Sequence, residues 1–173
     1  MNEWLDVVDA FDRPVRRERR DIVHEDALRH RAVSVWICDP RGNLWIQQRS
    51  EHKDQEPGLY SPTASGHVDA GEGYRAAAQR ELFEEAGLTA TLCHLTTLPA
   101  TKATGLEFTA IFVGVTPEQP NPCPIEVRRM RNVRHAELAE WLRRQPGLFS
   151  SSFVATYHWL HASNQLPGRN TCS

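Results

Sequence analysis

The chain has 173 residues, 40% of them hydrophobic, which is enough for one well-buried core and short for two. Its formal net charge of −2 and pI of about 6.4 give no general electrostatic reason to expect nucleic acid or an acidic membrane as a partner. The longest apolar runs, such as residues 32–38, are too short to cross a bilayer as a helix, so we expect a single soluble domain over residues 1–173.

Cysteine and histidine usage adds two expectations. The four cysteines are far apart and form no Cys-x-x-Cys pair, and the sequence does not start with a secretory apolar segment, which together predict a cytoplasmic protein. Among the eight histidines, only His158 and His161 show a zinc-ligand spacing. Neither has a cysteine or an acidic partner nearby, so the sequence predicts no zinc site.

The first fifty residues predict a small N-terminal unit followed by a β-hairpin. Two strand-like runs around the Asp-Arg-Pro turn at 12–14 indicate an N-terminal hairpin, and residues 21–29 fit a short helix. Residues 31–38 and 43–50 are rich in β-branched and aromatic side chains. They are joined by Asp-Pro-Arg-Gly, a strong turn signal, and so predict a second hairpin.

The middle of the chain predicts a loop and a central helix. Residues 51–65 are polar and interrupted by prolines and a glycine, which indicates a loop that ends in a short strand leading into Gly66. Residues 73–86 are good helix formers and stop at Gly87, the residue type expected just past a helix C-terminus. This segment is therefore the predicted central helix.

The rest of the chain predicts three strands, at residues 89–100, 106–116 and 126–133. Two helices are predicted after them, at residues 135–145 and 149–163. Phe153, Tyr157 and Leu160 form one apolar stripe on the last helix. The tail, residues 167–173, is expected to fray.

Three glutamates, Glu81, Glu84 and Glu85, fall within a sector about 100° wide on the predicted central helix. Carboxylates at such spacing repel one another, and more strongly when they are partly buried. Mg²⁺ would offset this repulsion, because it prefers carboxylate oxygens and commonly bridges to substrate phosphates. A solvated surface helix with intrahelical ion pairs is the alternative interpretation.

Glycines bracket this helix, and an acidic residue stands at its entry. Residues 66–88 resemble the Nudix box, whose signature is G-x5-E-x7-R-E-U-x-E-E-x-G-U with U an apolar residue. All nine specified positions match, namely Gly66, Glu72, Arg80, Glu81, Leu82, Glu84, Glu85, Gly87 and Leu88.

The resemblance implies an α/β fold of the α+β kind, a sandwich with a mixed β-sheet between helices and an added N-terminal hairpin. It implies hydrolysis of the diphosphate bond in a nucleoside diphosphate linked to another group X. It also implies that Glu81, Glu84 and Glu85 bind Mg²⁺, or Mn²⁺ in its place, together with the carbonyl of Gly66. Arg80 would orient these carboxylates by pairing with another glutamate of the box, Glu72 or Glu84.

Hydrolysis also needs a general base and phosphate contacts. Glu81 is the first candidate for the base, and Glu107 and Glu126 stay open as alternatives outside the box. Three basic residues near the expected mouth of the site are candidate phosphate contacts, although such side chains are more often only solvated: Arg49, Lys53 and His67.

Residues 4–90 also resemble the isopentenyl diphosphate isomerases. Isomerases of that type need a catalytic cysteine in the strand just before the box, where residues 61–65 read Ser-Pro-Thr-Ala-Ser. Because a serine cannot readily replace a thiol in moving protons at an isoprenoid carbon, the sequence favours a hydrolase over an isomerase. A catalytically silent nucleotide-binding module is a third interpretation, and a homodimer through the N-terminal hairpin stays open.

Overall fold

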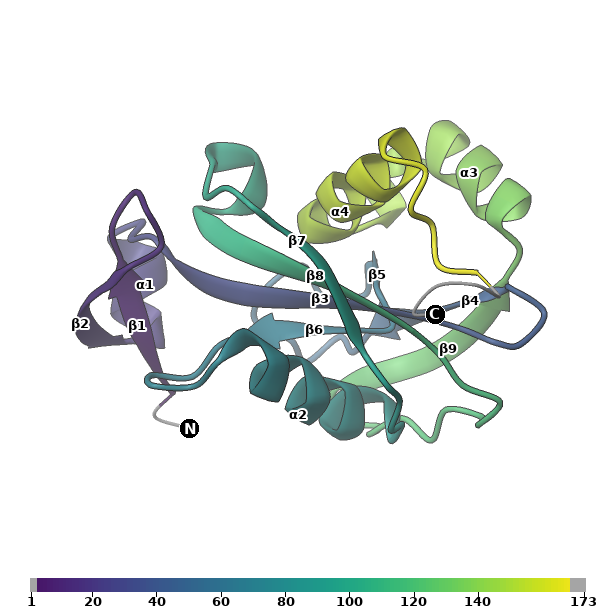
Figure 1. Ribbon diagram of the computed structural model, residues 1–173, viewed down its shortest axis with the longest axis horizontal. Coiled ribbons are helices and arrows are strands. Elements are labelled where there is room, and N and C mark those ends of the chain that lie inside the picture. Colours follow the sequence, from purple (N-terminus) through teal and green to yellow (C-terminus); the bar gives the residue numbers. More distant parts are fainter. Residues whose placement is uncertain (1–2, 169–173) are drawn as a thin grey trace.

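The computed structural model describes residues 3–168, which form two sheets and four α-helices (Figure 1). The first half contains β1 (Trp4–Val8), β2 (Pro14–Arg19), α1 (Arg20–Glu25), β3 (His30–Cys38), β4 (Leu44–Arg49), β5 (Tyr60–Ser61), β6 (Ala64–His67) and α2 (Tyr74–Ala86). The second half contains β7 (Cys93–Leu98), the 3-10 helix η1 (Lys102–Thr104), β8 (Glu107–Val115), β9 (Val127–Val133), α3 (His135–Arg144), the 3-10 helix η2 (Pro146–Leu148) and α4 (Ser151–Ala162).

The larger sheet is mixed. Its main path runs β5-β4-β3-β8-β7, with β6 paired to β3 and β9 paired to β4. Strands β3 and β8 are parallel and begin in register at His30 and Glu107, whereas the other named pairs are antiparallel. The expected mixed sheet is therefore confirmed, and its register places His30 beside Glu107.

Helices cover both faces of this sheet, with α2 on one side and α3 and α4 on the other (Figure 1). Successive side chains of β3 alternate between the two layers, as the pleat requires. Trp36 packs with Phe153 of α4, while Val35 packs with Leu82 of α2. The structure is thus the expected α/β/α sandwich.

Helix α2 begins and ends where the sequence predicts. Gly87 adopts the left-handed conformation with φ of +62°; its N–H donates to the Phe83 carbonyl at 2.9 Å, and the Leu88 N–H donates to the Leu82 carbonyl at 3.4 Å. The small apolar residues Ala78 and Ala86 lie on the buried face. The helix can therefore sit close to the sheet.

The N-terminal hairpin β1–β2 docks beside the entry to α2. The Ala70 N–H donates to the Trp4 carbonyl at 2.8 Å, and the Gly71 N–H donates to Asp6 Oδ2 at 2.8 Å. Leu5 and Val23 are buried in a small core of their own. A hairpin that would be marginal alone is stabilised by these contacts.

Two sequence expectations need adjustment. The β3–β4 hairpin pairs only at Ile37–Trp45 and Cys38–Leu44, because β3 continues along β6 and β8 while β4 continues along β9. The loop at 51–65 ends in two short strands, β5 and β6, in place of one. Of the helices in residues 3–168, none has the length and apolar character that a membrane span needs. The tail that was expected to fray, residues 167–173, falls largely outside the described residues.

Candidate active site

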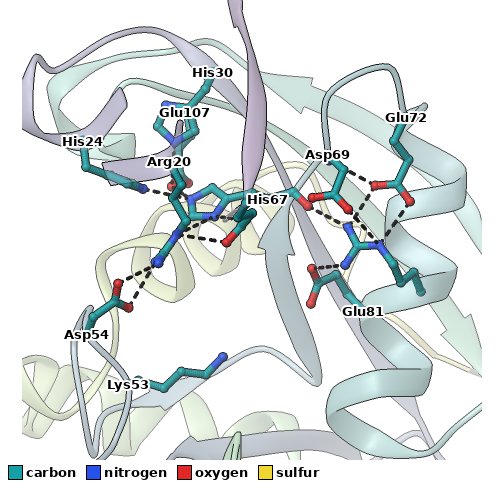
Figure 2. Close-up of polar contacts among 12 residues, drawn as sticks. Arg20, His24, His30, Lys53, Asp54, His67, Asp69, Glu72, Glu81 and Glu107 are labelled. Atoms are coloured by element: carbon teal, nitrogen blue, oxygen red, sulfur yellow. Dashed lines mark hydrogen bonds and ion pairs between the residues drawn. The ribbon is translucent and has the colours of Figure 1, made fainter. Parts of the chain in front are cut away.

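A cleft of about 1170 Å³ opens between the N-terminal hairpin, the loop after β4, β6, α2 and the start of α4. Figure 2 shows two polar groups in it. One contains His24, His30, His67 and Glu107, and the other contains Asp69, Glu72 and Glu81. The Arg80 guanidinium pairs with these three carboxylates. The groups meet at His67, whose carbonyl oxygen accepts a hydrogen bond from Arg80 Nη2 at 3.0 Å.

Glu85 is the most deeply buried carboxylate of the box, with 2% of its surface exposed. Its Oε2 accepts hydrogen bonds from Gln47 Nε2 at 2.6 Å and from the Ser65 N–H at 2.9 Å. Its Oε1 has no hydrogen-bond partner among the described residues, and the Lys53 ammonium lies 3.4 Å away. Burial raises the pKa of Glu85, and the charge of Lys53 opposes that rise.

Glu81 lies against Gly66. A Cβ on Gly66 would overlap the Glu81 carboxylate, since even the farther oxygen would be only 2.6 Å away. Burial, and then the negative charge of Glu85, raise the pKa of Glu81 to about 7, while Arg80 opposes the rise. A divalent cation that prefers oxygen ligands fits these residues, because it would coordinate the Glu85 oxygen that accepts no hydrogen bond and offset the repulsion between the two carboxylates.

The Arg80 guanidinium connects the acidic residues of the box. It contacts Glu72 Oε2 at 2.9 Å, Glu81 Oε1 at 2.7 Å and Glu84 Oε2 at 3.2 Å. The structure thus brings Arg80 to both partners that the sequence suggested, and adds Glu81. A planar, forked donor can hold several carboxylates at fixed spacing.

The three glutamates do not share one environment, contrary to the single acidic sector expected from helix geometry. The Glu84 side chain is 54% exposed and Glu81 13%, whereas Glu85 points into the protein. Glu85 can lie on the packing side of α2 because Gln47 and the Ser65 N–H supply hydrogen bonds there.

The end of β4 and the loop after it place two of the candidate phosphate contacts, Arg49 and Lys53, in the cleft. Lys53 forms ion pairs with both Glu85 and Glu126. Burial lowers the pKa of Lys53, but these two carboxylates outweigh burial and raise it. Arg49 lines the cleft and donates to the Gln55 carbonyl at 3.0 Å, which fixes the loop.

His24, His30 and His67 form a cluster that the sequence did not predict. Their ligand atoms lie within 4.8 Å of one another, and the Nε2 atoms of His24 and His67 are 3.2 Å apart. Two nitrogens bound to one tetrahedral ion at about 2.0 Å would be about 3.3 Å apart. Glu107 Oε1 lies 3.6 Å from Nε2 of both His30 and His67, which makes it a fourth candidate ligand.

Hydrogen bonds with residues around the cluster hold the rings of His30 and His67. His30 Nδ1 donates to the Leu28 carbonyl at 2.9 Å, which leaves Nε2, a buried atom with no hydrogen-bond partner among residues 3–168, as the ring nitrogen that could bind a metal. His67 Nδ1 lies 3.2 Å from Glu3 Oε1. The cluster is therefore a second candidate metal centre, separate from the carboxylates of the box.

Charges within the cluster are strongly coupled. Burial lowers the pKa of His67, but hydrogen bonds with Glu107 and Glu3 outweigh burial and raise it to about 9. Burial raises the pKa of Glu107, but contacts with His30 and His67 lower it to about 2. Burial, and then the positive charge of His67, lower the pKa of His24 to about 4. A cation bound here would take the place of the proton on His67.

A family model described as a NUDIX domain matches residues 28–152. The chain belongs to the Nudix family. This Nudix chain is 33% identical over 159 residues to an isopentenyl-diphosphate Delta-isomerase of Serratia proteamaculans, covering 89% of each chain. It is 38% identical over 86 residues to a Nudix hydrolase of Yersinia pestis, covering 50% of this chain and 47% of that one.

Solved structures share the Nudix fold. DR0079 from Deinococcus radiodurans superposes with a TM-score of 0.76 at 24% identity, covering 90% of this chain and 96% of that one. The NUDIX domain of Shewanella oneidensis NrtR, solved with ADP ribose, superposes with a TM-score of 0.59 at 16% identity. The superposition covers 77% of this chain and 86% of that one. The family and fold expected from residues 66–88 are confirmed, and the family supports chemistry of the pyrophosphate-hydrolase kind. Its relatives carry both isomerase and hydrolase names.

Proposed function

We propose that this Nudix chain hydrolyses, with Mg²⁺, the diphosphate bond in a nucleoside diphosphate linked to another group X. The observation that carries the proposal is the partly buried Glu81 carboxylate against Gly66 with the buried Glu85 nearby, whose Oε1 lacks a hydrogen-bond donor among the described residues. Two buried anions side by side are costly unless a cation lies between them. We place the reaction in the cytoplasm, on a small molecule, with neither nucleic acid nor membrane as partner.

Each residue of the box then has a role. Glu81, Glu84, Glu85 and the Gly66 carbonyl would hold Mg²⁺, or Mn²⁺ in its place. When bound, the ion neutralises charge on the phosphate oxygens and lowers the pKa of a coordinated water. Arg80 keeps the glutamates in place through its three carboxylate contacts.

The basic residues of the cleft bind the substrate's phosphates in this proposal. Arg49 ends β4 and Lys53 lies on the loop that follows, where it already faces Glu85. An ammonium at this position can shift from a carboxylate to a phosphate oxygen when metal and substrate bind. The His67 ring is engaged with Glu3 and Glu107, so its phosphate contact is the weakest of the three proposed from the sequence.

Glu81 remains our candidate for the general base. Glu107 contacts two histidines and its pKa is lowered to about 2, which makes it a weak proton acceptor. Glu126 forms an ion pair with Lys53. Glu81 lines the cleft beside Gly66, so it can reach a substrate bound at the box.

Isomerisation of isopentenyl diphosphate is the second candidate, favoured by the 33% identity to a protein of that name. Residues 61–65, where the resemblance to the isomerases calls for a thiol, contain no cysteine and carry Ser61 on β5 and Ser65 on β6. Cys38 is buried in β3, and burial raises its pKa to about 11. Cys123, on the loop before β9, is a free thiol that lines the cleft, so a Cys123→Ser variant belongs in the test.

The test is a panel of nucleoside diphosphate derivatives, incubated with and without Mg²⁺ and assayed for phosphomonoester products. We expect Mg²⁺-dependent cleavage that falls at least 100-fold in Glu85→Gln, since metal sites contribute several kcal/mol to such reactions. Glu140→Gln, on the exposed face of α3, is the matched control and should retain activity. Conversion of isopentenyl to dimethylallyl diphosphate without cleavage of any nucleotide would establish the isomerase, and saturable binding without turnover would indicate a silent binding module.

A further inference from the structure

The loop between β4 and β5, residues 51–58, lines the cleft and is held there by polar contacts with three of its walls. None of these eight residues belongs to the hydrophobic clusters formed within residues 3–168. The two ends of the loop are joined, because the Arg49 N–H donates to the Leu59 carbonyl at 2.9 Å. A segment with joined ends and no buried apolar side chain can move as one unit without disturbing the core.

The first contact joins the loop to α1. Arg20 Nη1 and Nη2 donate to the two carboxylate oxygens of Asp54, at 2.6 and 3.0 Å (Figure 2). The Arg20 guanidinium lowers the pKa of Asp54 to about 2, so this pair is charged at neutral pH. Because both oxygens are engaged, the contact fixes the orientation of the carboxylate as well as its position.

The second contact joins the loop to the start of α4. Glu56 Oε1 accepts a hydrogen bond at 2.7 Å from the N–H of Ser151, the first residue of that helix. A carboxylate is favoured at this end of a helix. Glu56 itself has a φ of +47°, a left-handed conformation that is unfavourable for a residue with a Cβ. The contact therefore holds the loop against backbone strain.

The third contact places a cation on a candidate metal ligand. The Lys53 ammonium lies 3.4 Å from Glu85 Oε1, the oxygen that accepts no hydrogen bond from the described residues. A divalent cation on this oxygen would repel the ammonium, because like charges so close together and partly buried interact strongly. Lys53 directly precedes Asp54 in the chain, so a Lys53 that leaves Glu85 pulls on the contact with Arg20.

We propose that residues 51–58 form a strap that closes over the metal-free cleft, and that a divalent cation taken up by Glu85 opens the strap by displacing Lys53. Lys53 then becomes available to substrate phosphates only after the metal has bound, so the cation precedes the substrate. Because linked equilibria are reciprocal, a change that loosens the strap must also tighten metal binding. The proposal rests on the metal site of the proposed function and does not depend on cleavage of any substrate.

Calorimetric titration of the full chain with Mg²⁺ tests this coupling. Asp54→Asn and Glu56→Gln each weaken one contact of the strap, and each should lower the Kd of Mg²⁺ about 2- to 5-fold, which corresponds to the loss of one exposed ion pair. Asp21→Asn is the matched control, because it removes the same charge beside Arg20 but pairs with Arg19 and not with the loop. This control should not lower the Kd.

The sign of the effect separates the strap from simple electrostatics. Removing a negative charge near the cleft weakens the attraction for a cation, so without a strap both loop variants should bind Mg²⁺ less tightly. A Kd that is unchanged or raised in both Asp54→Asn and Glu56→Gln would therefore overturn the proposal.

Amide hydrogen exchange measured by NMR gives a second readout. The Ser151 N–H is protected by Glu56, whereas the neighbouring Ser150 N–H donates to the Tyr60 carbonyl at 2.8 Å. Saturating Mg²⁺ should raise the exchange rate of the Ser151 amide about threefold or more and leave that of Ser150 unchanged. Glu85→Gln should abolish this response.

The outcomes distinguish the strap from the reaction. Mg²⁺ binding that is lost in Glu85→Gln, with no change in exchange at Ser151, would overturn the strap and leave the proposed metal site intact. An absence of Mg²⁺ binding would overturn both. Opening of the strap by Mg²⁺ in a protein that cleaves no nucleotide would support the strap and count against the hydrolase.

Discussion

Replacing Glu81 with glutamine should stabilise the metal-free protein. Burial and the nearby Glu85 raise the pKa of Glu81 from 4.5 to about 7, so the folded protein binds its proton more tightly than the unfolded chain does. Stability therefore falls as the pH rises through this range, because the unfolded state releases the proton first. Each tenfold change in proton affinity corresponds to about 1.4 kcal/mol. The titration of Glu81 therefore lowers the free energy of unfolding by about 1 kcal/mol at pH 5 and by about 3 kcal/mol at pH 8.

Glutamine resembles the protonated acid in size and carries no charge, so Glu81→Gln removes this cost. Urea denaturation in EDTA should show the variant more stable than the wild type by about 3 kcal/mol at pH 8 and by about 1 kcal/mol at pH 5. Glu84→Gln is the matched control on the same helix. Its side chain is mostly exposed, and we expect a difference within about 0.5 kcal/mol.

Mg²⁺ should reverse the order of stability. An ion present at about 100 times its Kd stabilises the folded wild type by about 2.7 kcal/mol, and Glu81→Gln should gain much less because a ligand is missing. The reasoning is refuted if Glu81→Gln is less stable than the wild type in EDTA at pH 8, or if both proteins gain equally from Mg²⁺.

Three further predictions follow from the geometry. Gly66→Ala should abolish the stabilisation of the protein by Mg²⁺, because its Cβ would overlap the Glu81 carboxylate. Gly73→Ala, with open space around the Cβ, is the control and should retain this stabilisation. If the two variants behave equally in a thermal shift assay, the predicted contact is contradicted. The wild type should bind one Co²⁺ in the histidine cluster and show a visible absorption band. His24→Ala should lose this band, and the control His158→Ala should keep it. An unchanged band in His24→Ala would exclude the cluster as the site of binding. In EDTA, protonated His67 should stabilise the folded protein fully below about pH 6.5. This contribution to the free energy of unfolding should decline by about 3 kcal/mol up to pH 9, where the folded-state pKa of His67 lies. A His67→Gln variant whose urea midpoint declines as steeply with pH would disprove this.

Short-range signals made the order of elements and the box predictable. The helix-forming residues 73–86 and the glycine that follows them, Gly87, act through neighbours in the chain, and α2 ends where they indicate. The same holds for the turn between β3 and β4, where Asp39 Oδ1 accepts from the backbone of Arg41 and Asn43. The fold class followed from the resemblance to the Nudix box.

The histidine cluster could not be predicted because it depends on how the strands pair. His30 meets Glu107 through the parallel β3–β8 register, and His67 joins them because β6 runs antiparallel along β3. His24 reaches the cluster from α1. The irregular spacing of these histidines matches no local ligand motif, and the one signal in the sequence was a histidine directly after Gly66.

The burial of Glu85 was also beyond local reasoning. On a helical wheel, Glu85 borders the apolar sector, and helix geometry alone does not decide which border residue turns inward. Gln47 and the Ser65 N–H, on β4 and β6, provide hydrogen bonds that make the buried position tolerable. Lys53 adds a positive charge from the loop after β4.

A crystal structure of the protein grown with Mn²⁺, with an anomalous difference map, tests the central claim most directly. We predict a peak about 2 Å from the carboxylates of Glu81 and Glu85 and from the carbonyl oxygen of Gly66, with Lys53 moved away from Glu85. A map without a peak at this position, with Lys53 still paired to Glu85, would contradict the proposal that these carboxylates hold the catalytic cation.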